Sequence, residues 1–219
     1  MTKARDLASG NPAPSTVSTT ELGYLDGVTS AIQTQVDSKL ATAQSGLIKI
    51  IPSSVAVGSG TGSASASGTV TFSGASSVSL NGVFTSTYKN YRIAFTAKNA
   101  SAADLSFFLR AAGTNLTGSS YLQGRYFTGM QNSIASNNQG NITQGYWDVN
   151  QLGTVSGHFV MDIFNPQTAE VTTATTTCTG AYFQVLGQSV LTSNTTSYDG
   201  FSVSTGSTIT GSVSVYGYN

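Results

Sequence analysis

The side chains that could perform catalysis or bind a metal are few and are scattered along the chain. There is one histidine, His158, and one cysteine, Cys178, so a metal site built on them would need several carboxylates as well. A Ser-His-Asp triad would have to use His158, yet the sequence contains no G-x-S-x-G nucleophile elbow. We interpret His158 as a strand-surface residue and Cys178 as a half-buried strand residue. The sequence therefore predicts no catalytic residue, no metal site and no cofactor.

A pair of carboxylates would be a second type of catalytic site, because glycoside hydrolysis needs two of them about 5–10 Å apart. Of the 9 acidic residues, four precede residue 45: Asp6, Glu21, Asp26 and Asp37. In the rest of the chain, Asp148 with Asp162 is a conceivable pair. Isolated carboxylates at strand ends and in turns explain these positions better, so we expect that the chain is not an enzyme.

Two polar, aromatic-rich stretches, residues 112–147 and 192–200, offer binding chemistry instead. Tyrosine and tryptophan present flat apolar faces beside hydrogen-bonding groups, which suits a neutral sugar or another polar surface. We predict that both stretches are loops between core strands, where binding residues tend to lie. The predicted receptor-binding residues are Tyr121, Arg125, Tyr126, Asn138, Tyr146 and Trp147. Alternatively, these aromatic residues are ordinary core and strand residues, with Trp147 in "GYWDV" partly buried.

The elements that must position these side chains are strands. From Ser45 onward, apolar and polar residues alternate, for example in "NYRIAFTA", "LSFFLRAA", "SGHFVMDIF" and "ITGSVSVYGYN". In each stretch the alternation places one set of apolar residues on a single face of the strand: Tyr91, Ile93, Phe95, Leu105, Phe107, Leu109, Phe159, Met161, Ile163, Ile209, Val213 and Val215. For residues 58–68, "GSGTGSASASG", we prefer short strands with a glycine-rich turn to a flexible linker. The pattern predicts a mainly β domain over residues 45–219, an antiparallel β-sandwich or jelly roll.

The first 44 residues differ in character from the rest. Residues 1–17 are small and polar and contain two prolines, so they are predicted to form an extended N-terminal arm. Residues 18–44 are predicted to be helical, with short helices at about 19–25 and 29–41. Their apolar side chains form one narrow stripe: Leu22, Leu25, Val28, Ile32, Val36 and Leu40. So short a helix needs a covering surface, which is either its own β domain or identical helices.

Charge and hydropathy exclude several partners. The formal net charge is +0, and charged residues make up 8% of the chain against roughly 25% in an average globular protein. Nucleic acid is therefore not an expected partner, since phosphate binding depends on clustered Lys and Arg. No apolar run reaches the roughly 20 residues of a membrane span, so we expect no membrane insertion. The N-terminus has no apolar signal-peptide core, which indicates synthesis in a cytoplasm without export.

The segment "ELGYLDGVTSAIQTQ", Glu21–Gln35, resembles a short trimeric helical element of many bacteriophage fibre and tail-fibre proteins. The "NYRIAF" strand and "GSVSVYGY", Gly211–Tyr218, are similar to C-terminal β domains of phage fibres. This resemblance implies a homotrimer within a virion. It implies that residues 1–17 anchor the chain to other virion proteins, that residues 18–44 form a trimerisation collar, and that residues 45–219 form a distal β domain.

The resemblance leads to a first hypothesis, a trimeric tail fibre that binds a host-surface carbohydrate through distal loops. Three linked copies of a weak site would then act together. The alternative is a structural virion component, such as a capsid decoration, cement or head-fibre protein with no receptor role. A polysaccharide depolymerase is disfavoured by the scarcity of carboxylates.

Overall fold

The computed structural model of the chain describes residues 46–129, 137–179, 183–191 and 194–219, together with the isolated positions Thr20 and Thr34. Backbone contacts divide the chain into two units, residues 1–45 and residues 46–219. The predicted arm and the collar with its stripe from Leu22 to Leu40 lie outside the described residues. Within the described part of the chain, no helix is long and apolar enough to cross a membrane.

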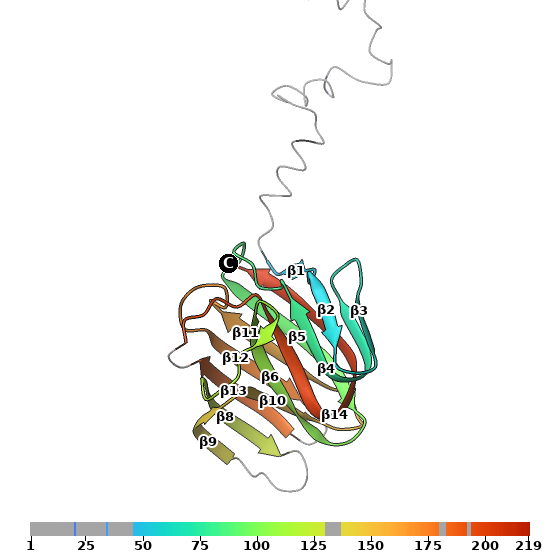
Figure 1. Ribbon diagram of the computed structural model, residues 1–219, viewed down its shortest axis with the longest axis vertical. Coiled ribbons are helices and arrows are strands. Elements are labelled where there is room, and N and C mark those ends of the chain that lie inside the picture. Colours follow the sequence, from blue (N-terminus) through green and yellow to red (C-terminus); the bar gives the residue numbers. More distant parts are fainter. Residues whose placement is uncertain (1–19, 21–33, 35–45, 130–136, 180–182, 192–193) are drawn as a thin grey trace, which may run out of the picture. The chain divides into compact units, whose positions relative to one another are not determined.

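The second unit is built from strands, and every strand pair in its described part is antiparallel (Figure 1). The strands are β1 (Ile48–Ile50), β2 (Ser54–Val57), β3 (Thr61–Ala64), β4 (Val70–Asn81), β5 (Asn90–Asn99), β6 (Ala103–Ala111), β7 (Thr114–Asn115), β8 (Tyr121–Gly129), β9 (Asn137–Gln144), β10 (Trp147–Leu152), β11 (Gly157–Phe164), β12 (Thr173–Thr179), β13 (Phe183–Leu191) and β14 (Gly200–Tyr218). This confirms the predicted mainly β, antiparallel fold.

All the strands belong to one continuous hydrogen-bonded network. The network forms two sheets because the long strand β14 passes from one to the other. Its first part, Phe201–Ser204, pairs with β4 on one side and β6 on the other. Its later part, from Ile209 onward, pairs with β5, and with β4 and then β1 on its other side. We call the two halves the β6 sheet, in the order β10-β6-β14, and the β5 sheet, in the order β14-β5-β11-β12-β13-β8-β9.

The two sheets pack face to face. β10, at the edge of the β6 sheet, lies against β5, β8, β11, β12 and β13, with none of which it forms a ladder. On the inward face of the β5 sheet, the Phe95 ring stacks against Phe159 of the neighbouring strand and against Phe72 of β4, with ring centroids 4.8 Å and 5.5 Å apart. Each of the twelve residues that the alternation places on one face of its strand is at most 1% exposed, so the predicted alternation is confirmed and this face is the core face.

Several local predictions can be compared with the strands. His158 is exposed on β11 as predicted, whereas Cys178 on β12 is fully buried rather than half-buried. Short strands with a glycine-rich turn are confirmed in the 58–68 segment, where β3 pairs with β4. The prediction of a loop over residues 112–147 is wrong, because this stretch contains β7, β8 and β9 and the start of β10. Its polar residues hid the alternation that marks a strand.

Asn99 holds the corner at which β14 changes sheets. The β14–β6 ladder ends at Thr205, and the β14–β5 ladder begins at Ile209, opposite Asn99. The Asn99 side chain is 2% exposed. Its Nδ2 donates to the carbonyl oxygen of Ala103 at 3.0 Å and to the hydroxyl of Thr205 at 3.2 Å. Since Ala103 begins β6, one amide ties β5, β6 and β14 together at the bend.

We predict that Asn99→Ala lowers the free energy of unfolding by about 1–3 kcal/mol, because it removes a buried amide that donates to both Ala103 and Thr205. Urea denaturation followed by circular dichroism measures the change. Lys98→Ala is the matched control, since Lys98 is the exposed neighbour on the same strand and its loss should change stability by less than about 0.5 kcal/mol. Equal, small effects of both substitutions would contradict the role of Asn99.

Candidate functional site

Trp147 and Tyr121, both predicted to contact a receptor, are fully buried in the core. Trp147 stacks on Phe107 with ring centroids 5.8 Å apart, and it meets the Tyr121 ring edge-on at 5.4 Å. The prediction of a receptor-binding role is therefore wrong for these two residues. The physical reason is that β8 and β10 face the interior, where large aromatic rings leave water and pack against each other.

The Tyr121 hydroxyl is also committed to the interior. It donates to the carbonyl oxygen of Leu116 at 3.1 Å and accepts from the backbone N–H of Leu109 at 2.9 Å. Burial raises the pKa of the Tyr121 hydroxyl well above its usual range, so the group stays protonated as a donor. The bond from Leu109 joins β8 of one sheet to β6 of the other, and the bond to Leu116 fixes the segment after β7, so the hydroxyl has a structural role.

The remaining four predicted receptor-binding residues lie in β8, in β9 and in the bend before β10. Arg125, Tyr126 and Asn138 have side chains outside the described part of the structure; their backbones lie in β8 and β9, with Tyr126 opposite Asn138. Tyr146 is half-buried, and its ring lies 5.7 Å from the Phe108 ring. In the second predicted stretch Tyr198 is fully buried. Of the six predicted residues, Tyr146 is the one whose described side chain retains an accessible surface.

We predict that Trp147→Ala lowers the free energy of unfolding by about 3–5 kcal/mol, because it leaves a large cavity between the sheets. Chemical denaturation and near-ultraviolet circular dichroism measure the loss. Tyr146→Ala, at the half-buried neighbour, is the control and should lose far less. A Trp147→Ala protein as stable as the control would show that the indole does not support the core.

A row of accessible polar and aromatic side chains crosses the outer face of the β5 sheet. Arg92 of β5 lies opposite Tyr216 of β14 on one side and Asp162 of β11 on the other. Lys49 of β1 lies opposite Tyr216, and Thr175 of β12 lies opposite Asp162. Residues directly opposite one another on neighbouring strands share a face of the sheet, and these five point away from the core. We call them the Arg92 row.

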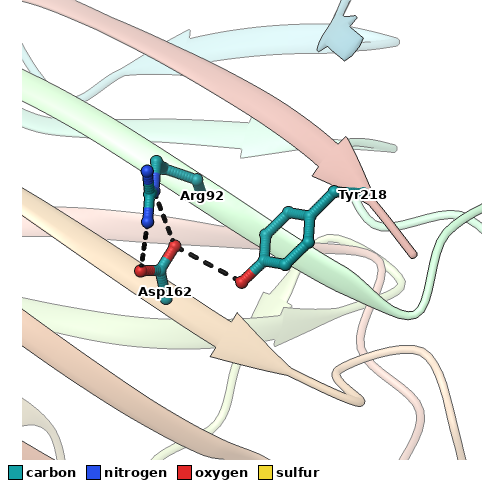
Figure 2. Close-up of polar contacts among 3 residues, drawn as sticks. All are labelled: Arg92, Asp162 and Tyr218. Atoms are coloured by element: carbon teal, nitrogen blue, oxygen red, sulfur yellow. Dashed lines mark hydrogen bonds and ion pairs between the residues drawn. The ribbon is translucent and has the colours of Figure 1, made fainter. Parts of the chain in front are cut away.

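Figure 2 shows the ion pair at the centre of this row. The Arg92 Nε donates to Asp162 Oδ1 at 2.8 Å, and Nη2 donates to Oδ2 at 2.7 Å. Such a fork-to-fork pair fixes the plane of the guanidinium. The Tyr218 hydroxyl makes a longer contact of 3.4 Å with Asp162 Oδ1. The hydrogen bond to Asp162 raises the pKa of Arg92, and burial, reinforced by the Asp162 charge, raises the pKa of Tyr218.

The ion pair is open to solvent, with side-chain exposures of 42% for Arg92 and 20% for Asp162. An exposed pair of this kind contributes only about 0–1 kcal/mol to folding. Its main physical consequence is therefore orientation, since each partner holds the other in one geometry on an open face.

Aromatic rings flank the pair. The Lys49 ammonium lies 5.9 Å from the centroid of the Tyr216 ring and also donates to the Thr69 hydroxyl. Tyr216 and Tyr218 are both half-buried, so each ring presents part of its surface to solvent. The row thus combines accessible rings with fixed donors and acceptors. This arrangement can bind a ligand that has both polar groups and apolar ring faces.

The conceivable catalytic carboxylate pair is separated by the core. Asp162 belongs to the Arg92 row on the outer face of the β5 sheet. Asp148 lies opposite Ser106 on the outer face of the β6 sheet, next to the buried Trp147. Packed sheets lie about 10 Å apart, so side chains on the two outer faces cannot share one substrate bond. Among the described residues, no cluster of His, Cys, Asp and Glu could hold a metal ion.

Sequence reasoning missed the Arg92 row as a site, although part of the signal was present. The alternation in "NYRIAFTA" and "ITGSVSVYGYN" places Arg92, Tyr216 and Tyr218 on the face away from the core. What was lacking is the strand order, because β5 lies between β14 and β11, which are distant in sequence. Alternation tells which face a residue occupies, and strand pairing tells which residues meet there.

No protein-family model matches the chain, and no curated protein is significantly similar to it. Among solved structures, the chain is similar to domain 4 of AbnA, a GH43 extracellular arabinanase from Geobacillus stearothermophilus, solved in complex with arabinotriose. The identity is 10% and the TM-score is 0.35, and the match covers 75% of this chain and 82% of that one. It is similar to peanut lectin with a 9mer peptide at 10% identity and a TM-score of 0.36, over 80% and 97% of the two chains. It is similar to the binding domain of botulinum neurotoxin serotype G at 10% identity and a TM-score of 0.23, over 81% and 45%. Similarities this distant assign neither a family nor a function.

Proposed function

We propose that this chain is a fibre protein of a bacteriophage virion, assembled as a homotrimer, that binds host-surface carbohydrate through its β domain. The observation that carries the binding proposal is the Arg92 row, where a fixed Arg92–Asp162 pair lies beside the accessible rings of Tyr216 and Tyr218. Sugars offer hydroxyls to such donors and acceptors and apolar ring faces to the tyrosines.

The proposed site lies on a sheet face rather than on loops. This differs from the binding site that the sequence predicts around residues 112–147, two of whose aromatic residues are in the core. A sheet face holds its side chains more rigidly than a loop does, so less conformational entropy is lost when a ligand binds. Phe108 on β6 and Tyr146 in the bend before β10 provide a smaller aromatic pair for comparison.

The virion and trimer parts of the proposal are supported by the resemblance of Glu21–Gln35 to the helical element of phage fibres. The amphipathic stripe there needs a surface to cover it, and sister helices provide one. Three β domains held together would also present three copies of the Arg92 row. Weak individual binding would then be strengthened, because the second and third contacts become intramolecular.

We predict that deletion of residues 19–41 converts the assembled protein into monomers, because it removes the whole apolar stripe. Sedimentation equilibrium or multi-angle light scattering measures the molar mass. Replacement of Gln33 and Gln35 by alanine, off the stripe, should leave the mass unchanged. A deleted chain that assembles as the intact one does would remove the basis for the trimer.

We predict that Tyr216→Ala combined with Arg92→Ala weakens binding of the full chain to host cells roughly tenfold or more, because the ring face and the charged donors are both lost. Flow cytometry with the labelled protein measures cell binding. Thr210→Ala, an exposed position on β14 outside the row, is the control. If the double variant binds as the control does, and particles without this chain still adsorb, a structural role as a decoration, cement or head-fibre protein replaces the adhesive one.

A further inference from the structure

The outer face of the β5 sheet carries an excess of positive charge within a nearly uncharged protein. Over the described strands β1, β5, β11, β12 and the later part of β14, this face holds three cations, Lys49, Arg92 and Lys98. The carboxylate on the same face of these strands is Asp162. With His158 neutral, three cations and one carboxylate leave a formal charge of +2, whereas the whole chain has +0.

Some of the guanidinium N–H donors of Arg92 stay available for a ligand after Arg92 pairs with Asp162. A guanidinium carries five N–H donors, and the two bonds to Asp162 use two of them. Among the described residues, Arg92 makes no other hydrogen bond that would occupy the remaining donors, and its side chain is 42% exposed. Asp162 therefore orients the guanidinium without using up its capacity to bind an acceptor.

Lys49 adds a second, uncompensated charge at the same site. Its ammonium lies 5.9 Å from the centroid of the Tyr216 ring, and its protein hydrogen bond goes to a neutral hydroxyl, that of Thr69. Lys49 and Arg92 lie on either side of Tyr216, two strands apart, which is about 10 Å. A ligand group above Tyr216 lies about one strand spacing, roughly 5 Å, from each cation. This is shorter than the Debye length of about 8 Å at physiological ionic strength, so both cations act on that group.

We infer that the ligand of the Arg92 row is an acidic polysaccharide whose carboxylates are bound by Arg92 and Lys49 while its sugar rings lie against Tyr216. This inference rests on the proposed function and deepens it by naming the ligand class. A ligand carboxylate matches the other edge of the Arg92 guanidinium, formed by Nη1 and Nη2, because the Nε–Nη2 edge is paired with Asp162. A single negative charge per sugar also suits a face on which Asp162 already cancels part of the positive charge.

The test uses the full chain and two forms of one polymer, polygalacturonate and the same polymer with its carboxyl groups reduced to alcohols. We expect roughly tenfold or more weaker binding of the reduced polymer by calorimetry. We also expect binding of polygalacturonate to weaken as salt rises from about 10 mM to 200 mM. Arg92→Ala and Lys49→Ala should each reduce the preference for the acidic form. Lys89→Ala, an exposed lysine in the turn before β5, is the control and should keep it.

The outcomes separate this inference from the proposed function. Equal binding of both polymers, or binding of neither, overturns the acidic ligand; the proposed function still stands if the Tyr216→Ala, Arg92→Ala variant loses host-cell binding. Competition by a phosphorylated polymer but not by polygalacturonate also overturns it and assigns phosphate instead. A preference for the acidic polymer that survives both Arg92→Ala and Lys49→Ala shows that the anion binds elsewhere, which overturns the inference as well.

Discussion

The bend of β14 between its two ladders is the constraint on which the rest of the β domain depends. One strand pairs with β6 up to Thr205 and with β5 from Ile209, so the two sheets must turn toward each other at this point. The buried amide of Asn99 holds the bend by bonding the start of β6 and the hydroxyl of Thr205. The aromatic core fills the space that the turn encloses, because that is where the inward rows of both sheets meet.

Buried polar side chains join the two sheets at positions where the backbone pairing between strands is interrupted. Gln123 of β8 is 2% exposed, and its amide bonds both backbone groups of Asp148 on β10, at 2.6 Å and 3.0 Å. The pairing of β10 with β6 is irregular next to this residue, so the side chain replaces ladder bonds that would otherwise be missing. Tyr121 makes a similar bridge to β6. These bridges explain why so polar a stretch folds into strands and why its aromatic rings turn inward.

The outer faces of the sheets carry charged and aromatic side chains that contribute little to the stability of the core. The Arg92–Asp162 pair contributes little to stability at its exposures of 42% and 20%, yet it holds two charged groups in a fixed geometry beside two tyrosine rings. The rigidity comes from the ladders beneath it, in which β5 is paired along its length with both β14 and β11. The core thus provides the platform, and the proposed binding surface lies on its solvent side.

The sequence by itself determined which residues of the regular strands face inward, because alternation is a local property: Ile93, Phe159 and Val215 are buried as their spacing predicts. It also determined the antiparallel β class through its turns and short apolar periods. Only the tertiary structure decided that Trp147 is a core residue and that Asp162 meets both Arg92 and Tyr218. Those facts depend on which distant strands become neighbours. Arg92 pairs with Asp162, 70 residues away, and with Tyr216, 124 residues away, and such pairing is set by the packing of the whole core rather than by local sequence.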